Sequence, residues 1–109
     1  MLDKKFAPDS IEAQVVEVLK TCYDPEIPVD IFSLGLIYDI EVTEDQRVNI
    51  TMTLTSPACP AAEILPPEVQ YKVKTRLQGR FDVHVELVWD PPWSVDLMSE
   101  AAKLELGMM

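Results

Sequence analysis

Few side chains in this sequence could act as nucleophiles or as ligands of a soft metal. The 109 residues include two cysteines, Cys22 and Cys59, and one histidine, His84. A closed zinc or iron–sulphur site uses four such ligands, and the chain contains no CxxC or HxxxH pair. The sequence therefore predicts that one chain alone builds no complete metal centre. A cluster would need further ligands from a second subunit, a partner protein or a small thiol.

Cys59 has the most distinctive surroundings. It stands among prolines in LTSPACPAAEILPPE, residues 54–68, after a strand-like run and before a helix-like one. Partial positive charge on the amides at a helix start lowers the pKa of a nearby thiol and favours the reactive thiolate. Thr53 and Thr55, just before it, offer hydroxyl groups. From the local sequence a buried packing role is an equally good alternative, because free cysteines are commonly buried.

The other cysteine and the histidine favour structural roles. Cys22 continues the apolar stripe of a predicted helix, which indicates packing in the core. His84 lies on the polar face of a predicted strand, where we expect a solvated or hydrogen-bonded side chain. Nothing in the spacing brings His84 to Cys59, so the sequence does not predict a Cys–His dyad.

Acidic side chains crowd a proline-containing loop, YDPEIPVD, residues 23–30. Asp30 is expected to cap a turn, as acids in such loops commonly do. Several roles stay open for Asp24 and Glu26, which could cap a turn, orient a thiol, bind a hard cation or face a partner.

The elements that position these residues follow from hydrophobic periodicity. Apolar residues recur at helical spacing over residues 9–21 and 67–79, with Asp9 as the N-cap of the first helix and Pro67 in the first turn of the second. Apolar and polar residues alternate over three further segments, which predicts half-buried strands at 36–43, 48–55 and 82–89. The residues expected on the buried face of the first strand are Leu36, Tyr38, Ile40 and Val42. Those expected on the outer face of the second are Asn49, Thr51, Thr53 and Thr55.

This order of elements predicts a two-layer α/β (α+β) fold over a single domain, residues 1–109. The crossover through the second helix makes the third strand parallel to the second, so we expect a three-stranded mixed sheet with both helices on one face. The tail after the last strand, VWDPPWSVDLMSEAAKLELGMM, residues 88–109, is expected to contain a short helix. Within it, Trp89 is expected to pack on its own domain and Trp93 to contact a partner.

Composition and charge exclude several classes of protein. Nine basic and nineteen acidic residues give a formal net charge of −10, which would repel nucleic acid and anionic membrane surfaces. Hydrophobic residues make up 48% of the chain, as in a folded domain, and no apolar run approaches the roughly 20 residues of a membrane span. The N-terminus lacks an apolar signal core, so we expect a cytoplasmic protein without a disulfide framework.

Three stretches together resemble one known family: DPEIPVDIFSLGLIYDI at 24–40, TMTLTSPACPAAE at 51–63 and VWDPPWSVDLMSEAAKLELG at 88–107. In this order they are similar to the iron–sulphur assembly domain family. That family contains the SUF-system accessory proteins of the SufT type, the PaaD-type proteins of the phenylacetate pathway and the cytosolic iron–sulphur targeting factors. The tail, and the lack of a cysteine-rich C-terminal segment, make the chain look most like the SufT type.

The resemblance implies an α/β fold and a role in maturing iron–sulphur proteins, so the protein is not expected to be an enzyme. It also implies that Cys59 is the reactive residue and shares a cluster with a partner as one of its ligands. The residues implied to line its pocket are Asp24, Glu26, Thr53 and Thr55. We expect at most a transient iron–sulphur cluster, none held stably by this chain alone.

The leading hypothesis is therefore an accessory factor that acts through Cys59 and through contacts with assembly or carrier proteins and client apoproteins. A homodimer would supply ligands from two chains. The first alternative is a pure adaptor without thiol chemistry, in which Trp93 and the acidic surface do the binding. Two others are a PaaD-like maturation partner of an oxygenase and, with no credible base in the sequence, a thiol enzyme.

Overall fold

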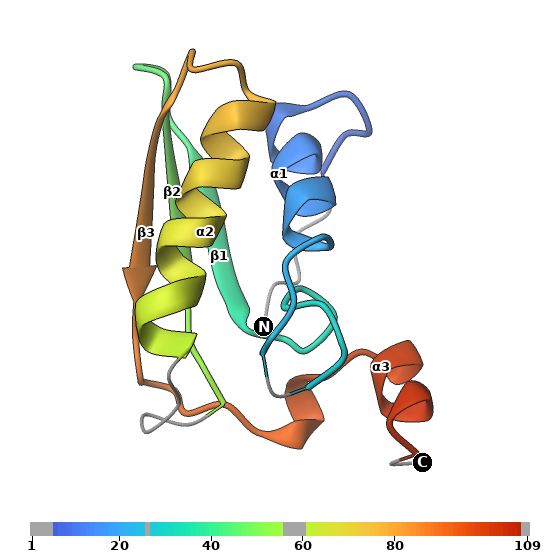
Figure 1. Ribbon diagram of the computed structural model, residues 1–109. Helices are drawn as coiled ribbons and strands as arrows, with labels where there is room; N and C mark the ends of the chain where they lie inside the picture. Colours follow the sequence, from blue (N-terminus) through green and yellow to red (C-terminus); the bar gives the residue numbers. More distant parts are fainter. Residues whose placement is uncertain (1–5, 26, 56–60, 108–109) are drawn as a thin grey trace.

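The computed structural model describes residues 6–25, 27–55 and 61–107 (Figure 1). The predicted order of elements is confirmed, and a 3₁₀ helix and a short α-helix follow the last strand. In chain order the elements are α1 (Ile11–Leu19), β1 (Ile37–Val42), β2 (Arg47–Met52), α2 (Ala61–Arg76), β3 (Asp82–Leu87), η1 (Val95–Leu97) and α3 (Glu100–Glu105).

The sheet is mixed, as the sequence predicts. Its strand order is β1-β2-β3, with β1 antiparallel and β3 parallel to β2. Both α1 and α2 lie on one face of the sheet and pack against each other (Figure 1). The opposite face of the sheet is open, so the fold has two layers.

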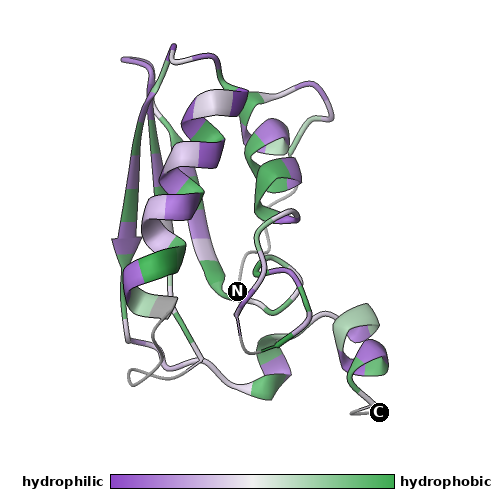
Figure 2. Ribbon diagram, in the orientation of Figure 1, coloured by the Kyte–Doolittle hydropathy of each residue, from purple (hydrophilic) through white to green (hydrophobic). Residues whose placement is uncertain are grey.

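The core lies between the sheet and the two helices. From β2 it receives alternate residues, which are Val48, Ile50 and Met52. From α2 and the residue that follows it, the core receives a stripe at four-residue spacing, which is Leu65, Val69, Val73 and Leu77. Each of these side chains is no more than 1% exposed. Hydrophobic and hydrophilic residues alternate along the helices and strands in Figure 2, as expected for elements with one buried side. Burial of the apolar sides against one another holds the helices to the sheet.

A β-bulge in β1 changes the predicted alternation. The register places Ile37 opposite Met52 and Ile40 opposite Ile50, with a break between residues 37 and 39. Ile37 and Ile40 are therefore both buried although they are three positions apart, since a bulge adds one residue to one strand. Tyr38, expected in the core, is only half-buried, and its hydroxyl donates to the carbonyl of Pro91 at 2.7 Å.

Both long helices begin at residues other than those predicted. Ser10, not Asp9, is the N-cap of α1, because its Oγ accepts from the amide of Ala13 at 3.1 Å. Helix α2 starts at Ala61 and contains Pro66 and Pro67 within its first turns. The buried stripe of α2 begins at Leu65, before both prolines, and this burial favours the earlier start over the preference of proline for a first turn.

The C-terminal segment folds back over the loop that precedes β1. The indole Nε1 of Trp93 donates to the carbonyl of Leu34 at 2.7 Å, and the amide of Ser99 donates to the carbonyl of Ser33 at 2.8 Å. Trp93 is half-buried against the core, whereas Trp89, expected to pack on its own domain, is 43% exposed. The binding of a partner by Trp93 stays a prediction.

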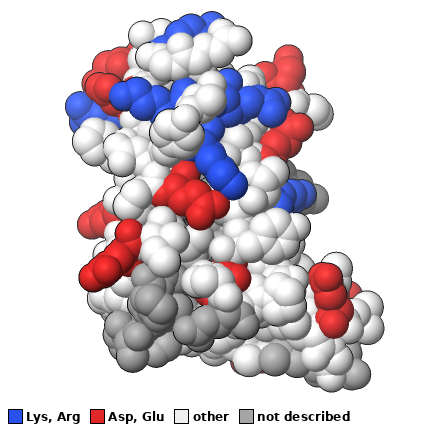
Figure 3. Space-filling model, in the orientation of Figure 1, with Lys and Arg blue, Asp and Glu red and all other residues white. Residues whose placement is uncertain are grey.

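Charge is unevenly distributed over the surface. Figure 3, in the orientation of Figure 1, shows basic side chains gathered across its upper part and acidic ones spread more widely. Within the described ranges, no helix is long and apolar enough to cross a membrane.

Candidate functional site

The predicted site residues belong to segments that meet at one end of the sheet. Ile37 at the start of β1 pairs with Met52 at the end of β2, and Met52 pairs with Leu87 at the end of β3. The acidic loop therefore enters the sheet at the end where β2 and β3 leave it. Ligands of open α/β sheets commonly bind beyond the carboxyl ends of parallel strands, so this end is the candidate site.

Strand β2 stops at Met52, and the chain then turns inward. The amide of Thr53 donates to the carbonyl of Leu36, and the amide of Val88 donates to the carbonyl of Met52, both at 2.8 Å. The prediction that Thr53 lies on the outer face is wrong, because it is fully buried at this junction. Thr55 is half-buried.

Asp24 and Thr53 are distinguished by their burial. Of all the polar or charged side chains in the described part of the chain, only these two are buried, Asp24 at 4% and Thr53 at 0% exposure. Burial of a polar group costs free energy unless an interaction compensates it. Two of the four residues that the family resemblance assigns to the pocket are thus the two polar residues that the fold buries.

The Thr53 hydroxyl is not satisfied in the usual way. Its Oγ1 is buried and has no hydrogen-bond partner of acceptable geometry among the described residues. The Thr53 hydroxyl affects the titration of Tyr38. Burial raises the pKa of the Tyr38 phenol, and the Thr53 hydroxyl partly offsets that rise. The Tyr38 hydroxyl donates to the Pro91 carbonyl, and the Thr53 hydroxyl makes no hydrogen bond of good geometry with a described residue.

Tyr38 is the residue of this region that sequence reasoning missed. Simple alternation assigned it to the core, but the bulge turns it toward the end of the sheet, where it links the C-terminal segment to the surroundings of Thr53. No local sequence signal marks the bulge, so the sequence offered no way to place Tyr38 there.

The acidic loop is closed on itself by backbone contacts. Tyr23 and Asp30 form an isolated antiparallel bridge, and the amide of Ile31 donates to the carbonyl of Cys22 at 2.8 Å. The carboxylate of Asp30 accepts from the amide of Ser33 at 2.9 Å, which confirms its predicted role as a turn cap. Glu26 and Cys59 lie outside the described residues, and their membership of the pocket stays a prediction.

Cys22 is a packing residue, as predicted. It is fully buried, and its thiol donates to the carbonyl of Val18 at 3.6 Å. Burial raises the pKa of the Cys22 thiol, an effect that the nearby charge of Lys72 only partly reverses. The raised pKa keeps Cys22 in the unreactive thiol form at neutral pH.

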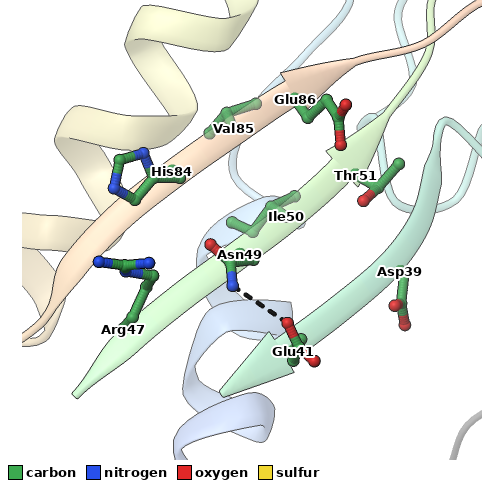
Figure 4. Close-up of a pocket in the computed structure, with 9 residues that line it drawn as sticks. All are labelled: Asp39, Glu41, Arg47, Asn49, Ile50, Thr51, His84, Val85 and Glu86. Atoms are coloured by element: carbon green, nitrogen blue, oxygen red, sulfur yellow. Dashed lines mark hydrogen bonds between the residues drawn. The ribbon is translucent and has the colours of Figure 1, made fainter. Parts of the chain in front are cut away.

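The open face of the sheet carries a separate polar hollow of about 530 Å³ (Figure 4). Arg47 and His84 lie at one end of it on neighbouring strands, and Asn49 donates to Glu41 at 3.0 Å across β2 and β1. His84 is exposed and pairs in register with Asn49, three residues and about 10 Å before the end of β2. The structure therefore places His84 on the solvent face, as predicted, and away from Thr53.

Metal ligation was tested on the described side chains. Residues 6–25, 27–55 and 61–107 contain no group of three or more His, Cys, Asp or Glu side chains that could hold a metal ion. This part of the chain does not fit a resident metal centre.

Comparison with known proteins agrees with the geometry. The sequence profile described as "Iron-sulfur cluster assembly protein" matches residues 12–87. The chain is 47% identical to a protein of Porphyromonas gingivalis named "Fe-S protein maturation auxiliary factor", over 90% of this chain and 92% of the relative. It is 40% identical to the "Fe-S protein maturation auxiliary factor SufT" of Staphylococcus aureus, over 78% of this chain and 96% of the relative.

The fold is similar to a solved structure as well. A domain of unknown function from Bacillus anthracis superposes with a TM-score of 0.84 at 38% identity, covering 91% of this chain and 93% of that one. The match of the family profile to most of the chain, together with these identities, confirms the resemblance drawn from the three sequence stretches. The chain belongs to the iron–sulphur cluster assembly protein family.

Proposed function

We propose that this protein is an accessory factor in the maturation of iron–sulphur proteins, and that it acts through the thiol of Cys59, which lies in sequence between β2 and α2. The cluster is cargo in this proposal. The Cys59 thiolate would be one iron ligand during transfer, and the carrier or client protein would supply the others. The protein itself catalyses no metabolic reaction.

The observation that carries the proposal is the similarity to maturation auxiliary factors over nearly the whole chain, 47% identity across 90% of it. The buried polar pair Asp24 and Thr53 adds support. Asp24 belongs to the loop that leads into β1, and Thr53 belongs to the segment that follows β2 at the same end of the sheet. In the sequence, Cys59 lies further along this second segment, between Thr55 and Ala61. A buried polar group near a thiol can stabilise the thiolate by hydrogen bonding.

The shortage of ligands supports an accessory role rather than storage. With no metal-binding group among the described residues, a cluster would have to be shared with a partner while it passes through. Partners with iron–sulphur chemistry, either carriers or client apoproteins, would satisfy that requirement.

The test is to replace Cys59 by Ser in cells that depend on this protein and to measure the activity of an iron–sulphur client enzyme such as aconitase. We expect the activity to fall to the level of cells that lack the protein. Cys22→Ala is the matched control, because it removes the buried thiol and leaves Cys59 in place. Full client activity with Cys59→Ser would exclude the thiol from the function.

A second candidate function is an adaptor without thiol chemistry. It is favoured by the apolar side chains exposed after β3, which are Trp89 at 43%, Val95 at 41% and Leu104 at 65%. Exposed apolar residues of this size are typical of protein-binding surfaces. Alkylation at neutral pH separates the two functions: rapid modification of Cys59 in the folded protein favours thiol chemistry, and resistance to modification favours the adaptor.

A further inference from the structure

A run of basic residues without acidic ones lies in the second half of α2 and just beyond its end. Residues 69–80 contain four of the nine basic residues and none of the nineteen acidic ones. These four, Lys72, Lys74, Arg76 and Arg80, are called the basic rim. Figure 3 shows basic side chains gathered over the upper part of the face on which α1 and α2 lie. In a chain with a net charge of −10 this segregation creates a local field of opposite sign.

Two residues of the basic rim, Lys72 and Arg76, line a groove between α1 and α2. The groove has a volume of about 280 Å³, and its lining includes Val18 and Thr21 from the first helix and its end, and Tyr71 and Thr75 from the second. Tyr71 is 72% exposed, which is unusual for an aromatic side chain that borders a groove. Exposed tyrosines beside apolar pockets are frequent energetic centres of protein interfaces.

The ion pairs of the rim leave part of its charge available. Lys72 pairs with Glu68 at 3.0 Å and Arg76 with Glu17 at 2.9 Å, and Glu17 itself lines the groove. Lys74 is exposed and forms no ion pair with any side chain that the structure describes. Arg80 is also exposed, and among the described residues its side chain donates only to the carbonyl of Leu77. An acidic ligand would therefore meet at least two cations without displacing an existing pair.

The groove is separated from the start of α2, although Thr21, which lines it, precedes Asp24 of the acidic loop by three residues. Tyr71 lies ten residues after Ala61, which is about 15 Å along the axis of α2. The site lies where β2 ends and α2 begins, whereas the basic rim lies toward the other end of the helix. A partner on the groove would leave that end of the sheet accessible.

We propose that the α1–α2 groove and its basic rim form a docking surface for an acidic amphipathic helix of a partner protein. An apolar side chain of that helix fills the groove against Val18 and Tyr71, and its carboxylates pair with Lys74 and Arg80. Charge complementarity selects the partner, because the rest of this chain repels acidic proteins. The docking surface does not include Cys59. This proposal therefore holds whether or not the thiol function proposed above is correct.

The probe for this docking surface is a synthetic helical peptide in which glutamates flank two leucines at i,i+4 spacing. We expect saturable amide shifts at α1 and α2 in NMR spectra of the whole chain, weakened by added salt. Tyr71→Ala and Lys74→Glu should each weaken the peptide affinity by about fivefold or more. Ile64→Ala, on the same helix and 53% exposed, and Lys103→Glu, a charge reversal outside the rim, should leave it unchanged.

Four results would overturn the docking surface. The first is an absence of saturable shifts, and the second is equal binding of a peptide with glutamine in place of glutamate. The third is self-association of the free protein that Tyr71→Ala abolishes, since the groove would then hold a second copy. The fourth is tighter binding of heparin that Tyr71→Ala does not alter, since the rim would then be a general polyanion site. Cys59→Ser should bind the peptide normally, which separates failure of the docking surface from failure of the thiol function.

Discussion

At the scale of single residues, two buried polar side chains of the candidate site lower the stability of the fold. The buried Thr53 hydroxyl lacks a partner of good geometry among the residues that the structure describes, and Asp24 is a carboxyl group at 4% exposure. Neither side chain is the choice that would maximise stability at a buried position, because apolar residues of similar size avoid the cost of desolvation. Retaining polar atoms at such a position is typical of a site kept for function.

This view predicts a specific trade-off for Thr53→Val, which replaces the hydroxyl by a methyl group of similar size. Because the hydroxyl is buried without a proper partner, the variant should be more stable by about 1 kcal/mol in urea unfolding. Client enzyme activity in cells should nevertheless decrease. Thr55→Val, at a half-buried position, is the control and should change stability little. A destabilised Thr53→Val protein would mean that the hydroxyl is satisfied in solution.

Cys22 predicts how stability depends on alkaline pH. Its pKa is raised by burial above the ordinary value of 9.0, so the unfolded chain releases this proton at lower pH than the folded one. Below pH 9 the thiol is neutral in both states. As the pH rises from about 9 through the folded pKa, this contribution to stability is lost. The free energy of unfolding, measured by denaturant titration between neutral pH and pH 10, should decline.

The matched variant for this effect is Cys22→Ala, which has no proton to release. It should be less stable at neutral pH because of the cavity it leaves, but it should decline less steeply with rising pH. Tyr38 titrates in the same direction, since burial also raises its pKa, so Tyr38→Phe is needed to separate the two groups. An unchanged slope in Cys22→Ala would contradict the assignment.

At the scale of elements, the type and order of the helices and strands were predictable and their ends were not. Alternation along β2 and β3 and the helical stripe of α1 are local patterns, and one buried face is enough to produce them. The bulge in β1 depends on how its residues meet those of β2, which no window of sequence contains. The start of α2 depends on the burial of Leu65, a tertiary contact that overrides the signal from Pro67.

The same distinction applies to the candidate site. The acidic loop and the threonines were singled out from the local sequence, and the family resemblance implied that they line one pocket, but neither source gives their burial. That Asp24 and Thr53 are the buried polar pair follows from packing of the loop before β1 on the end of β2, through the contact of Leu36 with Thr53. Tyr38 entered the region through the bulge and could not be found from its spacing.

The N-terminus of α1 gives a prediction that discriminates between two adjacent caps. Ser10 accepts from the amide of Ala13, so Ser10→Ala should cost about 1 kcal/mol of stability. Asp9→Ala, the residue favoured by the sequence pattern, should cost no more than a few tenths of that amount. Chemical denaturation of both variants measures the difference. A larger loss of stability for Asp9→Ala would mean that Asp9, the residue that the sequence pattern indicates, is the N-cap of α1 in solution.

At the scale of the whole molecule, the C-terminal segment and the loop before β1 form one unit. Tyr38 donates to Pro91, Trp93 donates to Leu34 and Ser99 donates to Ser33, so three hydrogen bonds connect segments more than fifty residues apart in sequence. This segment carries the apolar residues exposed after β3, and the loop carries the acidic site residues. Any partner that binds the tail therefore binds next to the loop that contains Asp24.

Gly35 is the position at which this long-range contact can be tested. Its φ is +80°, and a Cβ built on it would lie 2.2 Å from the backbone carbonyl oxygen of Leu97. Gly35→Ala should therefore both strain the loop and push the C-terminal segment away, and we expect a loss of about 3 kcal/mol or more. Gly79→Ala is the matched control, because Gly79 has a φ of +73° but nothing within 4 Å of the added Cβ. It should lose only about 1 kcal/mol, the cost of the backbone conformation alone.

Urea unfolding gives the two values, and limited proteolysis should cut Gly35→Ala, but not Gly79→Ala, between residues 88 and 107. Equal losses in the two variants, with no new cleavage, would mean that the C-terminal segment does not hold the loop in solution.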